Sequence, residues 1–320
     1  MKKIILGRTN HSVSKISLGT WSFGGSNKTG NISVGWSNQN KSDSKSALIK
    51  AWEKEINHWD TADVYGDGLC ESIIGDIWKI VPRDNIFLAT KVGWDKGAYS
   101  HWYHPEQILK NTERSLKNLK TDYIDLIYLH HCNFGKNDEY FDSALEILQD
   151  FKASGKTRFI GLSDWSCKKI MKFVNRCNPD VVQPLRNLMD DSYEESGLKA
   201  HVEKHNLGVC FFSPLKHGLL TGKYRKVPKF QDGDHRSQIS EFRNIELIKK
   251  MRENKKRLES RFSNIDNPVL HGLINSLLID SKTGCVLLGQ RNEEQVNIAA
   301  SIKSSISSED ADWVKSIYQN

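Results

Sequence analysis

The sequence lacks any long apolar run, which argues against a membrane-spanning helix. No stretch approaches the roughly 18 consecutive apolar residues that such a helix needs. The opening MKKIILGRTN has two lysines and only three apolar residues before charge returns, too few for the core of a signal peptide. Because hydrophobic residues still make up 38% of the chain, we predict a globular protein with a sizeable core and no membrane partner.

Paired cysteines are also missing. The six cysteines are scattered without a CxxC pair, and several lie in apolar runs where a thiol behaves as a small hydrophobic group. This pattern is not that of a disulfide framework, and it favours a reducing compartment, so we predict a cytoplasmic protein.

Familiar nucleotide and metal motifs are absent or incomplete. The sequence contains no GxGxxG, which argues against the common dinucleotide-binding fold. GLLTGK at 218–223 resembles a phosphate-binding loop, but its glycines are too close together and a tyrosine follows Lys223. Neither HHC at 130–132 nor HWYH at 101–104 has the spacing of a chelating set. We therefore predict no nucleoside triphosphatase activity and no metal.

The positive charge is moderate and does not indicate a nucleic-acid partner. The net charge is +7, and its densest run, KKMRENKKRLESR at 249–261, is interleaved with glutamates at helical spacing. Such a run is typical of a solvated helix face. A mild preference for anionic small molecules is compatible with this charge.

The chain does contain a regular alternation of short apolar runs and amphipathic segments. Helical stripes such as SALIKAWEKEI at 46–56 and SALEILQDFKASGK at 143–156 lie between the runs, and the second should end at Gly155. Parallel strands covered by helices are expected, and eight units favour a (β/α)8 TIM barrel. The eight predicted strands are 16–20, 56–62, 85–93, 123–130, 158–163, 181–185, 207–213 and 284–289.

No linker or low-complexity tract divides the chain, so we predict one domain over residues 1–320. The opening KIILGRTNHSVSKI suggests an N-terminal β-hairpin before the barrel. Two polar loops, 22–43 and 221–242, are unusually long and follow predicted strands. In a barrel both should lie on the face where active sites are built.

Four ionisable residues at the ends of three successive predicted strands suggest a proton-transfer device. Asp60 and Tyr65 belong to HWDTADVYG, Lys91 to FLATKVG and His130 to DLIYLH. Taken singly, each has an ordinary structural explanation. Together, Lys91 could lower the pKa of the Tyr65 phenol, Asp60 could keep Lys91 charged, and His130 could orient a substrate oxygen. A carbonyl reduction needs such a device, because hydride reaches carbon while a proton reaches oxygen.

Six segments of the chain, taken in order, resemble the aldo-keto reductase family, and the resemblance extends from Leu6 to about Gln295. The segments are DTADVYGDGLCE, ATKVG, DYIDLIYLH, GKTRFIGLSD, SPLKHGLLTGKY and LGQRNEEQ. The resemblance implies an oxidoreductase that reduces an aldehyde or ketone with NADPH, giving NADP. It also implies that Asp60, Tyr65, Lys91 and His130 are the catalytic tetrad, with Tyr65 as proton donor. A family alternative is a regulatory barrel with little turnover, like the channel auxiliary subunits.

The resemblance also implies a set of cofactor-binding residues. The set is Thr20, Trp21, Asp60, Ser163, Asp164, Gln183, Arg186, Ser213, Pro214, Leu215, Gly218, Lys223, Gly289, Arg291 and Gln295. Arg291 is expected to meet a 2′-phosphate, favouring NADPH over NADH.

Four positions depart from the family pattern. Asp164 replaces an asparagine, so a contact to the nicotinamide amide should change. Ile298 and Ala299 replace two polar adenine contacts, for which Asn297 could compensate. Arg186 replaces an aromatic residue that lies against the nicotinamide, and we expect its charge to favour the reduced cofactor.

The expected partner is a small carbonyl compound. Sugar aldehydes, keto-sugars and small ketones are all compatible with the sequence. The aromatic residues Trp21, Trp36, Trp94 and Trp102 follow predicted strands and could line the substrate pocket or serve as packing. The oligomeric state is left open.

Overall fold

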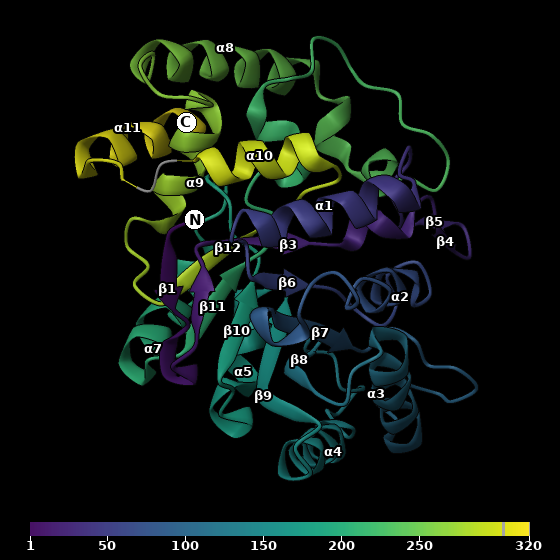
Figure 1. Ribbon diagram of the computed structural model, residues 1–320. Coiled ribbons are helices and arrows are strands. Elements are labelled where there is room, and N and C mark those ends of the chain that lie inside the picture. The colour runs from purple at the N-terminus through teal and green to yellow at the C-terminus, as the bar shows by residue number, and fades with distance from the viewer. Residues whose placement is uncertain (303–304, 320) are drawn as a thin grey trace.

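The computed structural model describes residues 1–302 and 305–319, and its centre is a closed barrel of eight parallel strands (Figure 1). The order around the barrel follows the chain, and the last strand pairs with the first to close it. All eight predicted strands are confirmed, and so is the (β/α)8 fold. The strands are β3 (Ile16–Gly19), β6 (His58–Asp60), β7 (Phe87–Val92), β8 (Ile124–Leu129), β9 (Thr157–Asp164), β10 (Val181–Pro184), β11 (Gly208–Phe211) and β12 (Gly284–Gly289).

Each strand is buried on both faces, which explains why the runs read as continuously apolar. In β11, Cys210 belongs to the core inside the barrel, whereas Val209 and Phe211 belong to the core between strands and helices. The same alternation places the side chains of His58 and Asp60 on one face of β6 and that of Trp59 on the other. Side chains that face the interior near the carboxyl ends of the strands therefore converge.

The helices cover the outside of the barrel. Their bounds are α1 (Lys41–Glu53), α2 (Leu69–Gly75), α3 (Pro105–Leu119), α4 (Phe141–Ala153), α5 (Cys167–Cys177), α6 (Ser192–Glu195), α7 (Leu198–His205), α8 (Ile245–Arg261), α9 (Pro268–Leu278), α10 (Glu293–Ser301) and α11 (Ser308–Gln319). Helix α4 ends close to the predicted Gly155, whose φ of +78° suits glycine. Among the described residues, no helix combines the length and the apolar character needed to cross a membrane.

The predicted N-terminal hairpin is present and closes the amino-terminal end of the barrel. It consists of β1 (Lys3–Ile5) and β2 (Ser12–Ser14), paired antiparallel. Leu6 and Val13 are buried in the same core cluster as the interior barrel residues. Gly7 lies at φ +50°, and a Cβ there would come within 2.2 Å of the Gly208 nitrogen, so this contact requires glycine.

The two long loops meet each other, as expected for loops on the same face. The first contains a small hairpin, β4 (Lys28–Thr29) and β5 (Ile32–Ser33). The Gly35 amide donates to the Gly233 carbonyl at 3.0 Å, and the His235 amide donates to the Gly35 carbonyl at 2.9 Å. We call the joined segments, residues 25–37 and 230–238, the loop clasp.

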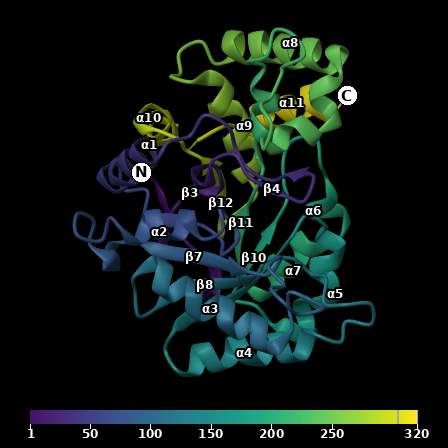
Figure 2. The ribbon, with the colours of Figure 1, turned by 90° about the vertical axis from the view of Figure 1, so that its right-hand side faces the viewer.

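A second core lies beside the barrel. Figure 2 shows α8, α9 and α11 gathered together, and their apolar residues form a cluster that includes Leu258, Leu273 and Val314. Helix α8 carries the basic run 249–261, and its charged residues alternate with the buried Met251, Asn254 and Leu258. The predicted amphipathic helix is therefore confirmed.

Candidate functional site

The four predicted catalytic side chains lie together at the carboxyl ends of adjacent strands. Asp60 ends β6, Lys91 lies in β7, and His130 directly follows β8. Tyr65 returns from the loop after β6, where its amide donates to the Ala62 carbonyl at 3.1 Å. Asp60 and Lys91 are each 1% exposed. The chain thus brings two opposite charges, a phenol and an imidazole to one place.

Lys91 is the centre of this group. Its ammonium forms a short ion pair with Asp60 and donates to the Thr61 carbonyl at 2.8 Å and to the Tyr65 hydroxyl at 3.3 Å. The second carboxylate oxygen of Asp60 accepts from the Gln183 amide at 2.8 Å. All three ammonium protons have partners, which fixes the geometry between charge and phenol.

Electrostatics favour a charged lysine and a neutral tyrosine. Burial of Lys91 favours the neutral amine, but Asp60 and Tyr65 outweigh it and the pKa of Lys91 is raised. Burial also raises the pKa of Tyr65, and Lys91 offsets only part of this effect. Lys91 thus lowers the pKa of the phenol in the expected direction, but burial has the larger effect and the pKa lies above its ordinary value. The phenol keeps its proton, as a proton donor must before reaction.

His130 faces Tyr65 with an uncharged ring. The two ring centroids are 5.7 Å apart at an interplanar angle of 75°, and the His130 amide is held by the Val92 carbonyl at 2.9 Å. Burial, followed by the charge of Lys91, holds the pKa of His130 well below its ordinary value. Its Nδ1 atom is buried without a partner. His131 instead contacts Trp94 and Tyr103, so only one of the two histidines reaches Tyr65.

Ser163 and Gln183 extend the polar network from the tetrad along β9 and β10. The Ser163 hydroxyl donates to the Gln183 side-chain carbonyl at 3.3 Å, and Gln183 in turn donates to Asp60. Asp164 has a different role, because its two oxygens accept from the Cys132 and Ser166 amides, each at 2.7 Å. Both contacts require an acceptor, so an ionised aspartate can replace the family's asparagine at this position.

Arg186 does not lie where the resemblance to the family implied, against the nicotinamide. Its guanidinium forms a short ion pair with Glu194 and donates to the Leu277 carbonyl at 3.1 Å. It also lies over the rings of Tyr193 and Phe211, at 4.8 and 4.7 Å. Phe211 packs in the layer between strands and helices, so the charge points out of the barrel. The prediction of a cation against the nicotinamide is therefore wrong in this structure.

Aromatic rings surround Tyr65 on the side of the loop clasp. The Trp21 ring stacks on Tyr65 with centroids 5.9 Å apart, and it also contacts Trp36, His217 and His235. Sequence reasoning missed both histidines, since nothing in their local pattern connects them with Trp21. The Thr20 hydroxyl already forms a hydrogen bond within the protein, because it donates to the Asp60 main-chain carbonyl at 3.0 Å.

A second aromatic group follows β7, β8 and β9. Trp94 contacts Trp102, His131 and Trp165, with centroids between 4.1 and 5.7 Å apart. Trp94 and Trp165 are 42% and 52% exposed, which is unusual for residues of their size. An apolar surface therefore lies next to the carboxyl ends of β7 and β8, where Lys91 and His130 lie.

Three basic side chains gather at the loop clasp, and we call them the cation cluster: Lys223, Arg236 and Arg291. Partial burial and the charges of Arg236 and Arg291 lower the pKa of Lys223. Within the described residues, Arg236 is the one member that forms an ion pair with a carboxylate, that of the fully buried Asp234, which also accepts from the Ser37 amide and hydroxyl. Uncompensated like charges favour a bound anion, so the cluster fits the phosphates of a dinucleotide. Sequence reasoning missed Arg236.

Arg291 belongs to this cluster but also holds the first long loop. Its guanidinium donates to the Gln39 side chain at 2.8 Å and to the Ser37 carbonyl at 2.6 Å. Its amide donates to the Gln295 side chain at 2.9 Å, beside the start of α10. Gly289 is the last residue of β12, and a Cβ added there would have no atom within 4 Å. These predicted positions lie together, and the helix start adds donors for an anion.

The predicted segment after β11 makes a tight irregular turn. Ser213 and Gly218 have φ of +58° and +87°, and the amide of Gly218 donates to the Leu215 carbonyl at 2.9 Å. Pro214 is buried within the turn. A Cβ on Gly218 would lie 3.1 Å from the Lys223 nitrogen, so glycine leaves room for that ammonium. The turn therefore positions one member of the cation cluster.

The two departures in α10 have structural roles. Ala299 is 2% exposed in the main core, and Ile298 is partly buried, so neither offers a hydrogen bond. Asn297 is exposed on the same helix.

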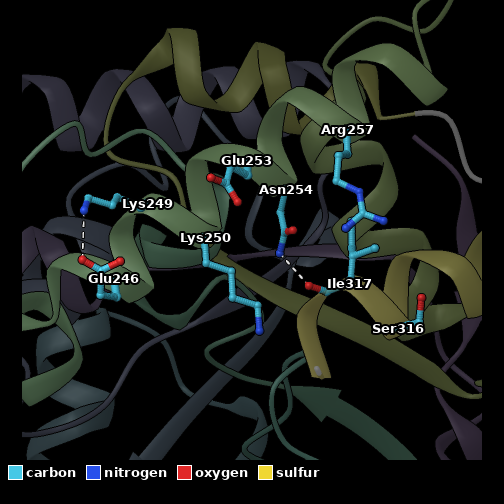
Figure 3. Close-up of a pocket in the computed structure, with 8 residues that line it drawn as sticks. All are labelled: Glu246, Lys249, Lys250, Glu253, Asn254, Arg257, Ser316 and Ile317. Atoms are coloured by element: carbon cyan, nitrogen blue, oxygen red, sulfur yellow. Dashed lines mark hydrogen bonds and ion pairs between the residues drawn. The ribbon is translucent and has the colours of Figure 1, made fainter.

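The surface also has an open hollow of about 530 Å³ between α8 and α11 (Figure 3). It contains no tetrad residue and no member of the cation cluster. Its charged side chains alternate in sign, and the Asn254 amide donates across it to the Ile317 carbonyl at 2.7 Å. This is a solvated helix face, and its lining residues are Glu246, Lys249, Lys250, Glu253, Asn254, Arg257, Ser316 and Ile317.

Comparison with known proteins agrees with the barrel fold. A model of the aldo/keto reductase family matches residues 15–319. The chain is 27% identical to the aldo-keto reductase YhdN of Bacillus subtilis, over all of this chain and 94% of the relative. It is 29% identical to an NADH-specific methylglyoxal reductase of Escherichia coli, over 69% and 70%. The solved glycerol dehydrogenase AKR11B4 of Gluconobacter oxydans is similar, with a TM-score of 0.81 and 26% identity over 98% and 94%.

Proposed function

The chain belongs to the aldo/keto reductase family, a family of oxidoreductases. On this premise we propose that it reduces an aldehyde or ketone to the alcohol with NADPH, and that Tyr65 donates the proton. The observation that carries the proposal is the 3.3 Å contact between the Lys91 ammonium and the Tyr65 hydroxyl, with Asp60 paired behind it. When bound, the nicotinamide supplies the hydride that the carbonyl carbon receives.

Each tetrad residue has a separate task in this proposal. Tyr65 gives its phenolic proton to the carbonyl oxygen as negative charge develops there. Lys91 stabilises the resulting phenolate, and Asp60 keeps Lys91 charged inside the barrel. The uncharged ring of His130, with its centroid 5.7 Å from that of Tyr65, orients the carbonyl oxygen by a hydrogen bond.

The choice of NADPH rests on the cation cluster. Asp234 is paired with Arg236, Lys223 is influenced by the charges of Arg236 and Arg291, and an extra phosphate would balance the remaining positive charge. The NADH-specific relative from Escherichia coli means that family membership alone does not select the cofactor.

The proposed setting is a single domain in the cytoplasm with a small carbonyl substrate. A single domain over 1–320 agrees with a barrel that closes only when β12 pairs with β3. A reducing compartment agrees with the six cysteines, none of which forms a disulfide among the described residues.

The direct test is NADPH oxidation, followed by absorbance, with a panel of sugar aldehydes, keto-sugars and small ketones. We expect steady turnover of at least one class, and its loss in Tyr65→Phe. Turnover by the wild-type chain also separates this function from that of a regulatory barrel. Reduction by Tyr65→Phe at the wild-type rate would show that the assigned proton donor is wrong.

A further inference from the structure

Four neighbouring strands at the closure of the barrel each turn one polar side chain inward. In barrel order β11, β12, β3 and β6, these are Cys210, Cys285, Ser17 and His58. Cys210 and Cys285 are register partners in adjacent parallel strands. All four residues are 0% exposed. They form an enclosed polar group inside the barrel, at the other end of β6 from the tetrad residue Asp60.

The potential ligand atoms of this group converge. The Ser17 hydroxyl lies 2.7 Å from Nδ1 of His58, and the Cys285 sulfur lies 3.5 Å from the same nitrogen. One ligand atom from each of His58, Cys210 and Cys285 lies within 4.8 Å of the other two. Nε2 of His58 is buried with no hydrogen-bond partner. Both cysteines are free.

Such a group is unusual in its surroundings. The same part of the interior contains the apolar side chains of Phe87, Leu126 and Val181, together with Tyr128. An imidazole in an apolar site costs free energy unless its polar atoms have partners, and the ring nitrogen of His58 toward which the hydroxyl and thiol converge is Nδ1. Two thiolate sulfurs and one imidazole nitrogen are donors found in tetrahedral zinc sites, and the serine hydroxyl oxygen supplies a fourth donor.

We propose that Cys210, Cys285 and His58 bind one Zn²⁺ inside the barrel, with the Ser17 hydroxyl as fourth ligand. Binding releases the two thiol protons to solvent, so two thiolates balance the metal charge and the filled site is neutral. Neutrality suits a site with no access to water. The donor set does not suit Mg²⁺ or Ca²⁺, which prefer oxygen ligands.

The site would be structural and independent of carbonyl reduction. Four protein ligands leave no open position for a substrate. The ligands connect β11 and β12 with β3 and β6, and His58 and Cys285 are 227 residues apart in the sequence. The metal would therefore tie the two ends of the sheet across the closure of the barrel.

The first experiment measures metal content. The tag-free chain is expressed with added zinc, purified with a thiol reductant and analysed by elemental mass spectrometry. Near-stoichiometric zinc is expected, together with a lower melting temperature after the chain is unfolded and refolded with a chelator. A chain that carries no stoichiometric zinc, or carries copper instead, overturns the proposal.

The second experiment identifies the ligands. Chain refolded with Co²⁺ should show the near-ultraviolet charge-transfer absorption of a cobalt thiolate. Cys285→Ser should lose it, whereas Cys177→Ser, the same change at a buried cysteine of α5, should keep it. Equal metal binding in both variants overturns the assignment, and so does a Cys210–Cys285 disulfide in the reduced preparation. If Cys285→Ser does not fold, the cobalt spectrum of the wild-type chain decides. A wild-type chain without the cobalt–thiolate absorption would also overturn the proposal.

Discussion

The tetrad and the cation cluster are two charged regions of opposite design. In the tetrad, Lys91 is balanced by Asp60 and has a partner for each proton, while both residues are almost fully buried. In the cation cluster, three basic side chains lie near one another, Asp234 is paired with Arg236, and the cations lie closer to solvent. The first region is complete without a ligand, whereas the second is complete only with an anion.

This difference separates catalysis from recognition. A balanced buried network holds its geometry before the substrate arrives, which is what a proton donor requires. Unbalanced cations instead supply binding energy when phosphates arrive. Changes in the tetrad should therefore affect turnover and stability, and changes in the cluster should affect cofactor affinity.

The largest expected effect is on turnover in Tyr65→Phe. Removing the donated proton should lower kcat by about 10²- to 10⁴-fold. The dissociation constant of NADPH should change by no more than about twofold, because the lost hydroxyl acts on the transition state. Steady-state kinetics and fluorescence titration measure both values.

Tyr99→Phe is the matched control, since that phenol is only partly buried, lies away from the tetrad and is bonded to Glu106. Its kcat should equal that of the wild type. A Tyr65→Phe variant that loses NADPH affinity while keeping its turnover would contradict the assignment of turnover to the tetrad and of cofactor affinity to the cation cluster.

Lys91→Met should cost the most stability. It leaves the Asp60 carboxylate buried without its cation, which typically destabilises a protein by about 3–5 kcal/mol. Urea unfolding at neutral pH measures the free energy of unfolding. Lys120→Met removes an exposed partner of Asp76 and should cost less than about 1 kcal/mol. Equal losses in the two variants would contradict the balanced buried pair.

Beside the tetrad, His131 should make stability sensitive to acid. Burial lowers the pKa of His131 to about 3, so the folded state binds its proton less readily than the unfolded state. Its contribution is present above the ordinary pKa near 6.5 and is lost as pH falls toward 3. Between pH 7.5 and pH 5 the loss should be about 2 kcal/mol.

His131→Phe keeps a ring against Trp94 and removes the titration. Urea unfolding of this variant should show a drop between the two pH values that is smaller by about the same 2 kcal/mol. An unchanged drop would assign the acid sensitivity to other groups.

In the cation cluster, Arg291→Ala should weaken NADPH binding about tenfold. NADH, which lacks the extra phosphate, should bind about as before, and the salt dependence of NADPH binding should decrease. Isothermal titration measures both affinities. Arg257→Ala, on exposed α8, is the control and should change neither. An equal loss for both cofactors would instead indicate a structural role through Ser37 and Gln39.

The smallest effect is expected for Arg186→Tyr. Because its guanidinium bonds to Glu194 outside the barrel, the ratio of NADPH to NADP dissociation constants should stay the same. The free energy of unfolding should fall, since the ion pair is lost. A shifted ratio would show that Arg186 reaches the cofactor after all.

The barrel, and the meeting of the four proposed tetrad residues, could be predicted from the sequence because both depend on local patterns read in order. Eight apolar runs give the strands, and parallel strands bring Asp60, Lys91 and His130 to the same edge. Prediction from the sequence failed for Arg186, since an aligned position does not specify where a long side chain points. It also missed Arg236 and His235, whose meeting with Trp21 and Arg291 depends on contacts between loops about 200 residues apart.

The pairing of β12 with β3 also affects the order in which the chain can fold during synthesis. Val286 is registered with Ile16, so the first barrel strand obtains one of its two neighbours only after residue 289 has left the ribosome. Asp60, Lys91 and His130 are all synthesised in the first half of the chain, yet their strands belong to an open sheet until then. The edge of that sheet needs protection from other nascent chains, and catalytic competence arises only after synthesis is nearly complete.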